Sequence, residues 1–224
     1  MATDTHRTDM ATSTRDTTRI DRVVVGLLLA ALSVAMVLYA LQFARASWNF
    51  AQARPEYLLV RKGQLPGELA LDALIRSLRE SPYKSDLSGA AFVQLIRAQQ
   101  MGVTSVRALP RLTAASRDLQ IGIAAAPADA FAWTRLAVSQ AELGDLKLAA
   151  SALAMALQLA PAERVLAPIQ FDLAVLLWDQ LDASAKTALQ QRLKWITGIP
   201  DLNNTSMGNS AQSLRLKLGG TSPR

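Results

Sequence analysis

A run of 22 residues without a charged side chain, from 23 to 44, constrains this chain more than any other feature. As a helix rising about 1.5 Å per residue, it would be roughly 33 Å long, enough to cross a bilayer core of about 30 Å. Arg22 and Arg45 stand at its two ends. A buried helix of a soluble protein is the alternative, but this length between two arginines favours a membrane-spanning helix. We therefore predict a transmembrane helix over 23–44, in contact with membrane lipid.

The sequence allows more than one interpretation of whether this segment is cleaved and of how it is oriented in the membrane. Ala44-Arg45-Ala46 has the small-x-small form of a signal-peptide cleavage site, but signal-peptide cores run about 7–15 residues, so an uncleaved anchor is favoured. Four basic residues precede the helix and four follow it within eighteen positions, so the positive-inside rule gives a tie. Because long C-terminal regions cross largely regardless of charge, we expect the C-terminal domain on the outer side of the membrane. For a Gram-negative bacterium this means an anchor in the bacterial inner membrane and a domain in the periplasm.

The regions around the apolar run differ in composition. Residues 1–22 are mostly polar and cannot bury enough apolar surface to offset the entropy of ordering, which predicts a disordered tail. We predict a linker over 45–65 and a helical domain over 66–197. Residues 198–224, rich in Gly, Asn and Ser, are predicted to be a flexible C-terminal tail.

One part of the C-terminal tail has a second interpretation. Leu214, Leu216 and Leu218 alternate with Arg215 and Lys217. This alternation has the period of a β-strand, which would suit docking on a partner. A frayed tail remains the simpler interpretation of the composition.

Three segments of the predicted domain share a helical pattern. Each has a large apolar residue, a small residue three positions on, a large residue beside it, and a proline four positions later that ends the helix. Pro127 and Pro161 are 34 residues apart, and Pro82 precedes Pro127 by 45, which is 34 with an insertion of eleven. Such a repeat predicts helix pairs that bury their apolar faces by stacking on one another. The sets are Leu74, Ser77 and Leu78; Leu119, Gly122 and Ile123; and Leu153, Ala156 and Leu157.

The last unit, residues 130–161, resembles a tetratricopeptide repeat (TPR), although Gln140 stands where that family usually has an aromatic residue. The resemblance implies an all-α fold in which the transmembrane helix precedes a short TPR-like α-solenoid of helical hairpins. We expect helices near 66–80, 86–101, 110–125, 129–143, 146–159, 164–181 and 183–197. The positions that match the family are Trp133, Leu136 and Ala137 in the first helix, Gly144 at the turn, Ala149, Leu153 and Ala156 in the second helix, and the terminator Pro161.

The resemblance also implies a binding surface. In TPR proteins the exposed face of each first helix lines a concave groove that takes peptides or partner helices. Carried onto this unit, the matching positions form a candidate partner-binding groove of Phe131, Thr134, Val138, Ala141 and Glu142. Phe131 is the principal candidate, because the fold does not require an aromatic side chain there. The alternative for Phe131 is packing against the preceding helix pair.

The composition argues against catalysis. The chain has no cysteine, and its one histidine, His6, lies in the polar tail, so thiol, triad and transition-metal chemistry lack their usual side chains. Asp179 and Asp182, three apart near a helix boundary, are typical of a helix cap rather than an acid–base pair. No glycine-rich phosphate loop is present, and the basic residues are too scattered for nucleic-acid binding at a net charge of +6. We predict no enzyme activity and no catalytic, cofactor or metal site.

These features together predict a non-catalytic scaffold that binds protein partners of a bacterial envelope complex at the membrane. The arrangement resembles small envelope proteins with an N-terminal anchor and periplasmic repeats. The Ala- and Leu-rich helices most resemble those that accompany polysaccharide biosynthesis and export. Two alternatives stay open: an auxiliary glycan-modifying enzyme with two carboxylates within about 10 Å, and a regulatory protein whose domain faces the cytosol.

Overall fold

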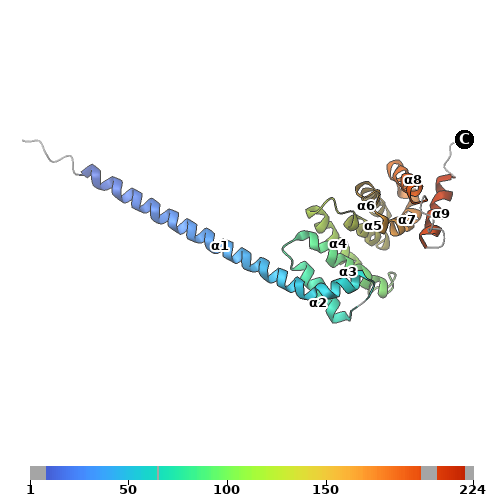
Figure 1. Ribbon diagram of the computed structural model, residues 1–224, viewed down its shortest axis with the longest axis horizontal. Helices are drawn as coiled ribbons and strands as arrows, with labels where there is room; N and C mark the ends of the chain where they lie inside the picture. Colours follow the sequence, from blue (N-terminus) through green and yellow to red (C-terminus); the bar gives the residue numbers. More distant parts are fainter. Residues whose placement is uncertain (1–8, 65, 198–205, 220–224) are drawn as a thin grey trace, which may run out of the picture. The chain divides into compact units, whose positions relative to one another are not determined.

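The computed structural model describes residues 9–64, 66–197 and 206–219 (Figure 1). Within these residues all regular secondary structure is helical and no strand occurs, which confirms the all-α prediction. The chain divides into two compact units, 1–49 and 50–224. One long helix, α1 (Asp9–Arg61), begins in the first unit and ends in the second.

The first unit contains the apolar part of α1. Val24–Asn49, 26 residues, is long and apolar enough to cross a membrane, and it contains nearly all of the segment predicted at 23–44. The prediction of disorder over 1–22 is wrong for 9–22, which continue α1. Extending an existing helix adds one hydrogen bond per residue without a new nucleation cost, so the polar residues that precede an apolar helical segment can join the same helix. Residues 1–8 lie outside the described part of the chain.

The second unit consists of the end of α1 and a series of shorter helices. Up to residue 197 their boundaries agree with the predicted ones within two residues, except that the helix predicted at 164–181 is divided into three. No helix was predicted where α9 (Ser206–Gly219) lies. A short 3-10 turn precedes α7 there and another follows it. The helices are α2 (Glu68–Arg79), η1 (Lys84–Asp86), α3 (Leu87–Gln100), α4 (Leu109–Ala125), α5 (Ala130–Glu142), α6 (Leu146–Leu159), η2 (Arg164–Leu166), α7 (Ala167–Leu176), η3 (Trp178–Gln180), α8 (Ala183–Thr197) and α9 (Ser206–Gly219).

The linker predicted over 45–65 is wrong for most of its length, because α1 continues through it and ends at Arg61. Pro55 stands inside the helix although it lacks a backbone N–H. Ala53, Tyr57 and Val60, on either side of this proline, lie at helical spacing and pack into a small core with α2 and α3. Burial of this face explains why the helix persists beyond the apolar run.

Consecutive helices of the second unit pack on one another. α3 packs against α4, and α5 against both α4 and α6 (Figure 1). The turn between α5 and α6 depends on Gly144, whose φ of 84° favours glycine. The Asp145 N–H closes the turn by donating to the Gln140 carbonyl at 2.9 Å. The Asp145 side chain then accepts a 3.0 Å hydrogen bond from the Leu148 N–H and caps α6.

The repeat positions lie mainly in the core of these helices. Leu74, Leu119 and Leu153 are fully buried, one in each repeat. Gly122 lets α4 approach the start of α3, since a Cβ there would lie 3.2 Å from the Ser88 backbone nitrogen. Of the positions within residues 130–161 that match the TPR family, Leu136, Ala137, Ala149, Leu153 and Ala156 are buried.

Two side chains of α5 bring polar groups into or beside the core, and both have hydrogen-bond partners. Trp133 is half-buried and its Nε1 donates a 2.9 Å hydrogen bond to the carbonyl of Pro127. Gln140, where the TPR family usually has an aromatic residue, is buried and donates to the Ser116 hydroxyl of α4 at 2.6 Å. The amide therefore has a partner, which removes much of the cost of burying it. Pro161 follows the end of α6, as the repeat predicts.

A buried arginine joins α8 to the end of α6. Arg192 is 2% exposed, and its Nη1 donates to the carbonyl of Ala160 at 3.0 Å. Its Nη2 donates to the carbonyl of Glu163. Burial lowers the pKa of Arg192, while the charge of Glu163 raises it. A cation at this position also complements the negative end of the α6 dipole.

The prediction of a flexible C-terminal tail is wrong for 206–219, which form α9 and pack against α7. Leu214 is fully buried, and Ala211 and Leu218 lie on the same helical face. Leu216, between them, is 73% exposed. Leucines at 214 and 218 fit a helix as well as an alternating strand, and packing on α7 selects the helix. The rest of the predicted tail, 198–205 and 220–224, lies outside the described residues.

Candidate functional site

The second unit has a groove of about 470 Å³ that is lined by α3, α5 and the start of α7, together with the C-terminal end of α1. We call it the α3–α5–α7 groove. Helices distant in the sequence therefore contribute to one surface. Its lining residues are Tyr57, Arg61, Ser88, Phe92, Asp129, Phe131, Thr134, Arg135, Val165, Leu166 and Ile169.

The start of α5 positions two of these side chains. Asp129 caps the helix: its Oδ1 accepts hydrogen bonds from the N–H groups of Phe131 at 3.0 Å and Ala132 at 3.1 Å. The cap places Phe131, 37% exposed, in the first turn of α5. Thr134, one turn on, is 2% exposed, and its Oγ1 accepts a 2.9 Å hydrogen bond from Nε2 of the buried Gln170. This bond joins α5 to α7 at the base of the groove.

Arg135 joins α5 to α3. Its guanidinium lies 4.4 Å from the centroid of the Phe92 ring, a cation–π contact. Its Nη1 also donates to the carbonyl of Ser88 at 3.3 Å. Both contacts hold the guanidinium in one orientation beside the groove.

The groove carries more positive than negative charge. Its lining includes the guanidinium groups of Arg61 and Arg135 but a single carboxylate, Asp129. Burial is the main cause that lowers the pKa of Arg135; Tyr57 and Asp129 raise it, and Arg61 lowers it. Arg61 and Arg135 thus repel each other, and an anionic group between them would relieve that repulsion.

Exposed apolar side chains lie beside these charges. Val165 is 73% exposed, Ile169 is 38% exposed and Phe131 is 37% exposed. Apolar surface gathered in a concavity and bordered by charge is typical of an interaction site. The arrangement suits an apolar chain segment that carries a carboxylate.

The structure separates the residues predicted for the partner-binding groove. Phe131 and Thr134 line the α3–α5–α7 groove. Val138 is buried in the core and Ala141 packs half-buried against it. Glu142 is exposed and does not line the groove. The difference arises because α5 packs against α3, α4, α6 and α7, which leaves its first turns open.

Sequence reasoning missed the basic and aromatic side chains of the groove. Tyr57 and Arg61 lie in the segment predicted to be a linker, so no helix face was assigned to them. Arg135 follows Phe131 by four residues and therefore lies on the same face of α5, a signal that was present in the sequence. The approach of Phe92 to Arg135 depends on the packing of α3 against α5.

Several carboxylates have structural partners. Asp182 caps α8 by accepting a 2.7 Å hydrogen bond from the Ala185 N–H, which is the main cause that lowers the pKa of Asp182. The Ser184 hydroxyl donates to the same oxygen at 2.9 Å and lowers this pKa further. Asp118, 7% exposed, accepts a 2.9 Å hydrogen bond from Nε of Arg79. Within the described residues, no three His, Cys, Asp or Glu side chains are grouped so that they could hold a metal ion.

Comparison with known proteins gives no indication of function, so a functional proposal has to be based on the geometry of the groove. The groove combines exposed apolar side chains with an excess of positive charge. In comparisons with known proteins, the chain matches no protein-family model and no curated protein.

Proposed function

We propose that this protein is a membrane-anchored helical adaptor that binds a segment of a partner protein in the α3–α5–α7 groove. The observation that carries the proposal is that three helices alternating along the chain, α3, α5 and α7, line one cavity of about 470 Å³. This volume lies in the range of about 300–1,000 Å³ typical of ligand sites. Val24–Asn49, long and apolar enough to cross a membrane, supports the role of anchor.

The groove favours a partner segment of defined chemistry. Phe131, Val165 and Ile169 offer apolar surface, and burying them against a partner would remove it from water. Arg61 and Arg135 offer guanidinium groups, which pair with carboxylates through charge-assisted hydrogen bonds. The occupant is therefore an apolar segment with an Asp or Glu side chain at its centre.

The proposal extends to the architecture and the place of the protein. The packed pairs α3–α4 and α5–α6, the Gly144 turn and the buried repeat positions support a TPR-like α-solenoid. The protein would act as a scaffold without a catalytic centre, anchored in the inner membrane of a bacterium with its helical domain in the periplasm. The resemblance to envelope proteins that accompany polysaccharide biosynthesis and export makes a complex of that kind the place to search for the partner.

Site-specific photo-crosslinking in intact cells tests the binding site. A photoreactive phenylalanine analogue replaces Phe131 or Ile169 in the groove, or Met155 on α6 as the control. Met155 and Phe131 are both 37% exposed, and Met155 does not line the groove. We expect one protein to be captured at both groove positions and not at Met155. Equal capture at all three positions, or no protein adduct at Phe131 and Ile169, would refute the proposal.

Charge variants test the chemistry of the partner. Arg61→Glu places a carboxylate in the groove and should reduce the crosslinking yield at Phe131 at least tenfold. Lys147→Glu makes the same change in charge at an exposed position of α6 outside the groove and should leave the yield unchanged. A partner whose capture increases in the Arg61 variant would contradict the assignment of an acidic segment.

Reporter fusions test the orientation. Alkaline phosphatase fused after Arg224 should be active, since it folds only on the periplasmic side, and green fluorescent protein at the same position should be dark after export. The opposite pair of results would place the domain in the cytosol and support the regulatory alternative.

A further inference from the structure

One arginine of the second unit lacks the partners that comparable arginines have. Of the arginines whose exposure the structure describes, four are buried or half-buried: Arg97, Arg111, Arg135 and Arg192. Arg97 and Arg111 form salt bridges with Asp72, and Arg192 donates to two carbonyl groups. Among the described residues Arg135 has no salt bridge, and its guanidinium makes a single hydrogen bond, of 3.3 Å, to a backbone carbonyl. A cation that is partly removed from water without an anionic partner is costly, so this position favours the binding of an anion.

Most N–H groups of Arg135 remain available for such an anion. A guanidinium has five N–H donors in one plane, a geometry that matches the two oxygens of a carboxylate. One donor binds the Ser88 carbonyl, and the cation–π contact with the Phe92 ring uses no hydrogen-bond acceptor. Arg135 lines the α3–α5–α7 groove. Its other donors can therefore bind a group that enters this groove.

The aromatic ring that contacts Arg135 is itself held by the fold. Phe92 is half-buried on α3 and packs against the small core that contains Val60, Leu74 and Leu78. The Arg135 guanidinium lies over this ring, 4.4 Å from its centroid. A side chain that is already ordered loses less conformational entropy when a ligand binds than a freely rotating one. The ring thus prepares Arg135 for binding before the partner arrives.

The second cation of the groove has a different environment. Arg61 is exposed, and its side chain makes no hydrogen bond, salt bridge or ring contact with the other described residues. An exposed charge is screened by water and salt, so it attracts an acidic segment without fixing its orientation. Arg61 therefore contributes charge, whereas Arg135 contributes charge and a defined geometry.

We infer that Arg135 selects the acidic side chain of the partner by a two-point contact with its carboxylate, and that Phe92 is a positioning residue that acts through Arg135. The inference rests on the proposed function, because it identifies the residues that recognise the occupant of the α3–α5–α7 groove. A carboxylate can accept two parallel N–H bonds from one guanidinium. The ammonium of a lysine would supply the same charge without this geometry.

Variants that preserve charge test the role of Arg135. The readout is the yield of the crosslink from the photoreactive analogue at Ile169 of the full-length protein in intact cells, quantified by mass spectrometry of the adduct. Arg135→Lys should lower this yield by about tenfold or more, because a lysine cannot form the two-point contact. Arg61→Lys should lower it by no more than about threefold, since an exposed lysine retains most of the attraction.

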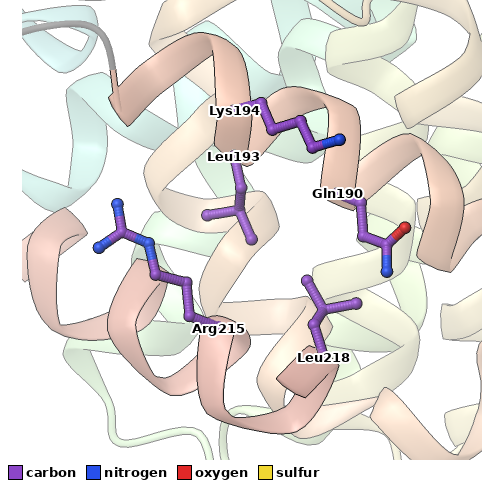
Figure 2. A pocket seen from close by; sticks show the side chains of 5 residues that line it. All are labelled: Gln190, Leu193, Lys194, Arg215 and Leu218. Carbon is purple, nitrogen blue, oxygen red and sulfur yellow. The ribbon is translucent and has the colours of Figure 1, made fainter. Parts of the chain in front are cut away.

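An arginine at a different pocket provides the matched control. Arg215 is exposed and lines a pocket of about 480 Å³ between α8 and α9 (Figure 2). The other residues that line this pocket are Gln190, Leu193, Lys194 and Leu218. Arg215→Lys makes the same chemical change outside the α3–α5–α7 groove and should leave the yield at Ile169 unchanged.

A double-mutant cycle tests the positioning role of Phe92. Phe92→Leu removes the ring but keeps an apolar side chain, and should lower the yield by about threefold to tenfold. Phe92→Tyr keeps the ring and should retain most of the yield. In an Arg135→Gln background, Phe92→Leu should have little further effect, because no guanidinium is left to position. The melting temperature of each purified variant in detergent checks that the protein is folded.

The outcomes distinguish this inference from the proposed function. Capture at Ile169 that is unchanged in Arg135→Lys would overturn selection by Arg135 and leave the groove as a binding site. An equal loss from Phe92→Leu in both backgrounds would show that the ring contacts the partner directly, which would overturn its positioning role. If no protein is captured at Phe131 or Ile169 without these substitutions, the proposed function is refuted, and the inference with it.

Discussion

Replacing Leu214 by alanine tests whether α9 is part of the folded core. Leu214 is 0% exposed and belongs to the same cluster of buried side chains as Phe171 of α7. The substitution removes three carbon atoms, a lost transfer free energy of about 2.4 kcal/mol at about 0.8 kcal/mol per methylene. The cavity left behind raises the expected cost to about 3–5 kcal/mol. For a unit of this size, the melting temperature should fall by roughly 6–20 °C.

Leu216→Ala is the matched control, because it makes the same chemical change two positions away in the same helix. Leu216 is 73% exposed, so its truncation should change the stability by no more than about 0.5 kcal/mol. Tryptophan fluorescence during thermal unfolding of the full-length protein in detergent is a suitable assay. Trp178 belongs to the same cluster as Leu214 and reports on its disruption.

The comparison separates three states of the C-terminal segment. A docked helix makes Leu214→Ala costly and Leu216→Ala nearly neutral. A frayed tail makes both variants neutral, and a strand that buries the alternating leucines makes both costly. Either of the last two outcomes would refute the packing of α9 against α7.

Three further predictions, tested with five substitutions, concern individual contacts. Gly122→Ala should lower the melting temperature, because its Cβ would lie 3.2 Å from a backbone nitrogen of α3. Gly89→Ala, whose Cβ would lie 3.5 Å from its nearest neighbours, should be neutral or stabilising by up to about 1 kcal/mol. A larger loss of stability in Gly89→Ala than in Gly122→Ala would contradict the packing. Thr134→Val should lower the free energy of unfolding in denaturant by about 1–3 kcal/mol, because the buried Gln170 Nε2 loses its acceptor. Thr134→Ser keeps a hydroxyl as acceptor and should retain most of the wild-type stability. Hydrogen bonds lower the pKa of Asp182, so its ionised form stabilises the fold above its unfolded pKa of about 3.9, and this contribution is lost as the pH falls through the folded value. Unfolding of Asp182→Asn should therefore depend less on pH below about 4 than that of the wild type, and identical pH profiles would count against the cap.

Much of the helical core followed from local signals in the sequence. Asp129 and Asp145 cap α5 and α6, and Gly144 adopts the positive φ that the turn between them requires. Leu119 and Leu153 recur at the spacing of one helical face and are buried. Such signals involve residues within about four positions of one another, so the sequence alone reveals them.

The candidate sites were only partly predictable for the same reason. Phe131 and Thr134 were assigned to a groove from the resemblance of residues 130–161 to a TPR, and both line the α3–α5–α7 groove. Arg135 lies on the same face of α5 as Phe131, but its contact with the Phe92 ring joins two helices of separate pairs. No local pattern reports that contact.

By itself the sequence determined that the chain is helical, that one segment is apolar and long enough to cross a membrane, and where most helices begin and end. Only the tertiary structure decided that α1 runs on to pack Tyr57 and Val60 against α2 and α3. It also decided that Leu214 faces the core while Leu216 faces outward, since leucines at 214 and 218 fit either a helix or a strand. A helix can form from local hydrogen bonds, but which of its faces is buried depends on the free energy of contacts with residues far away in the chain.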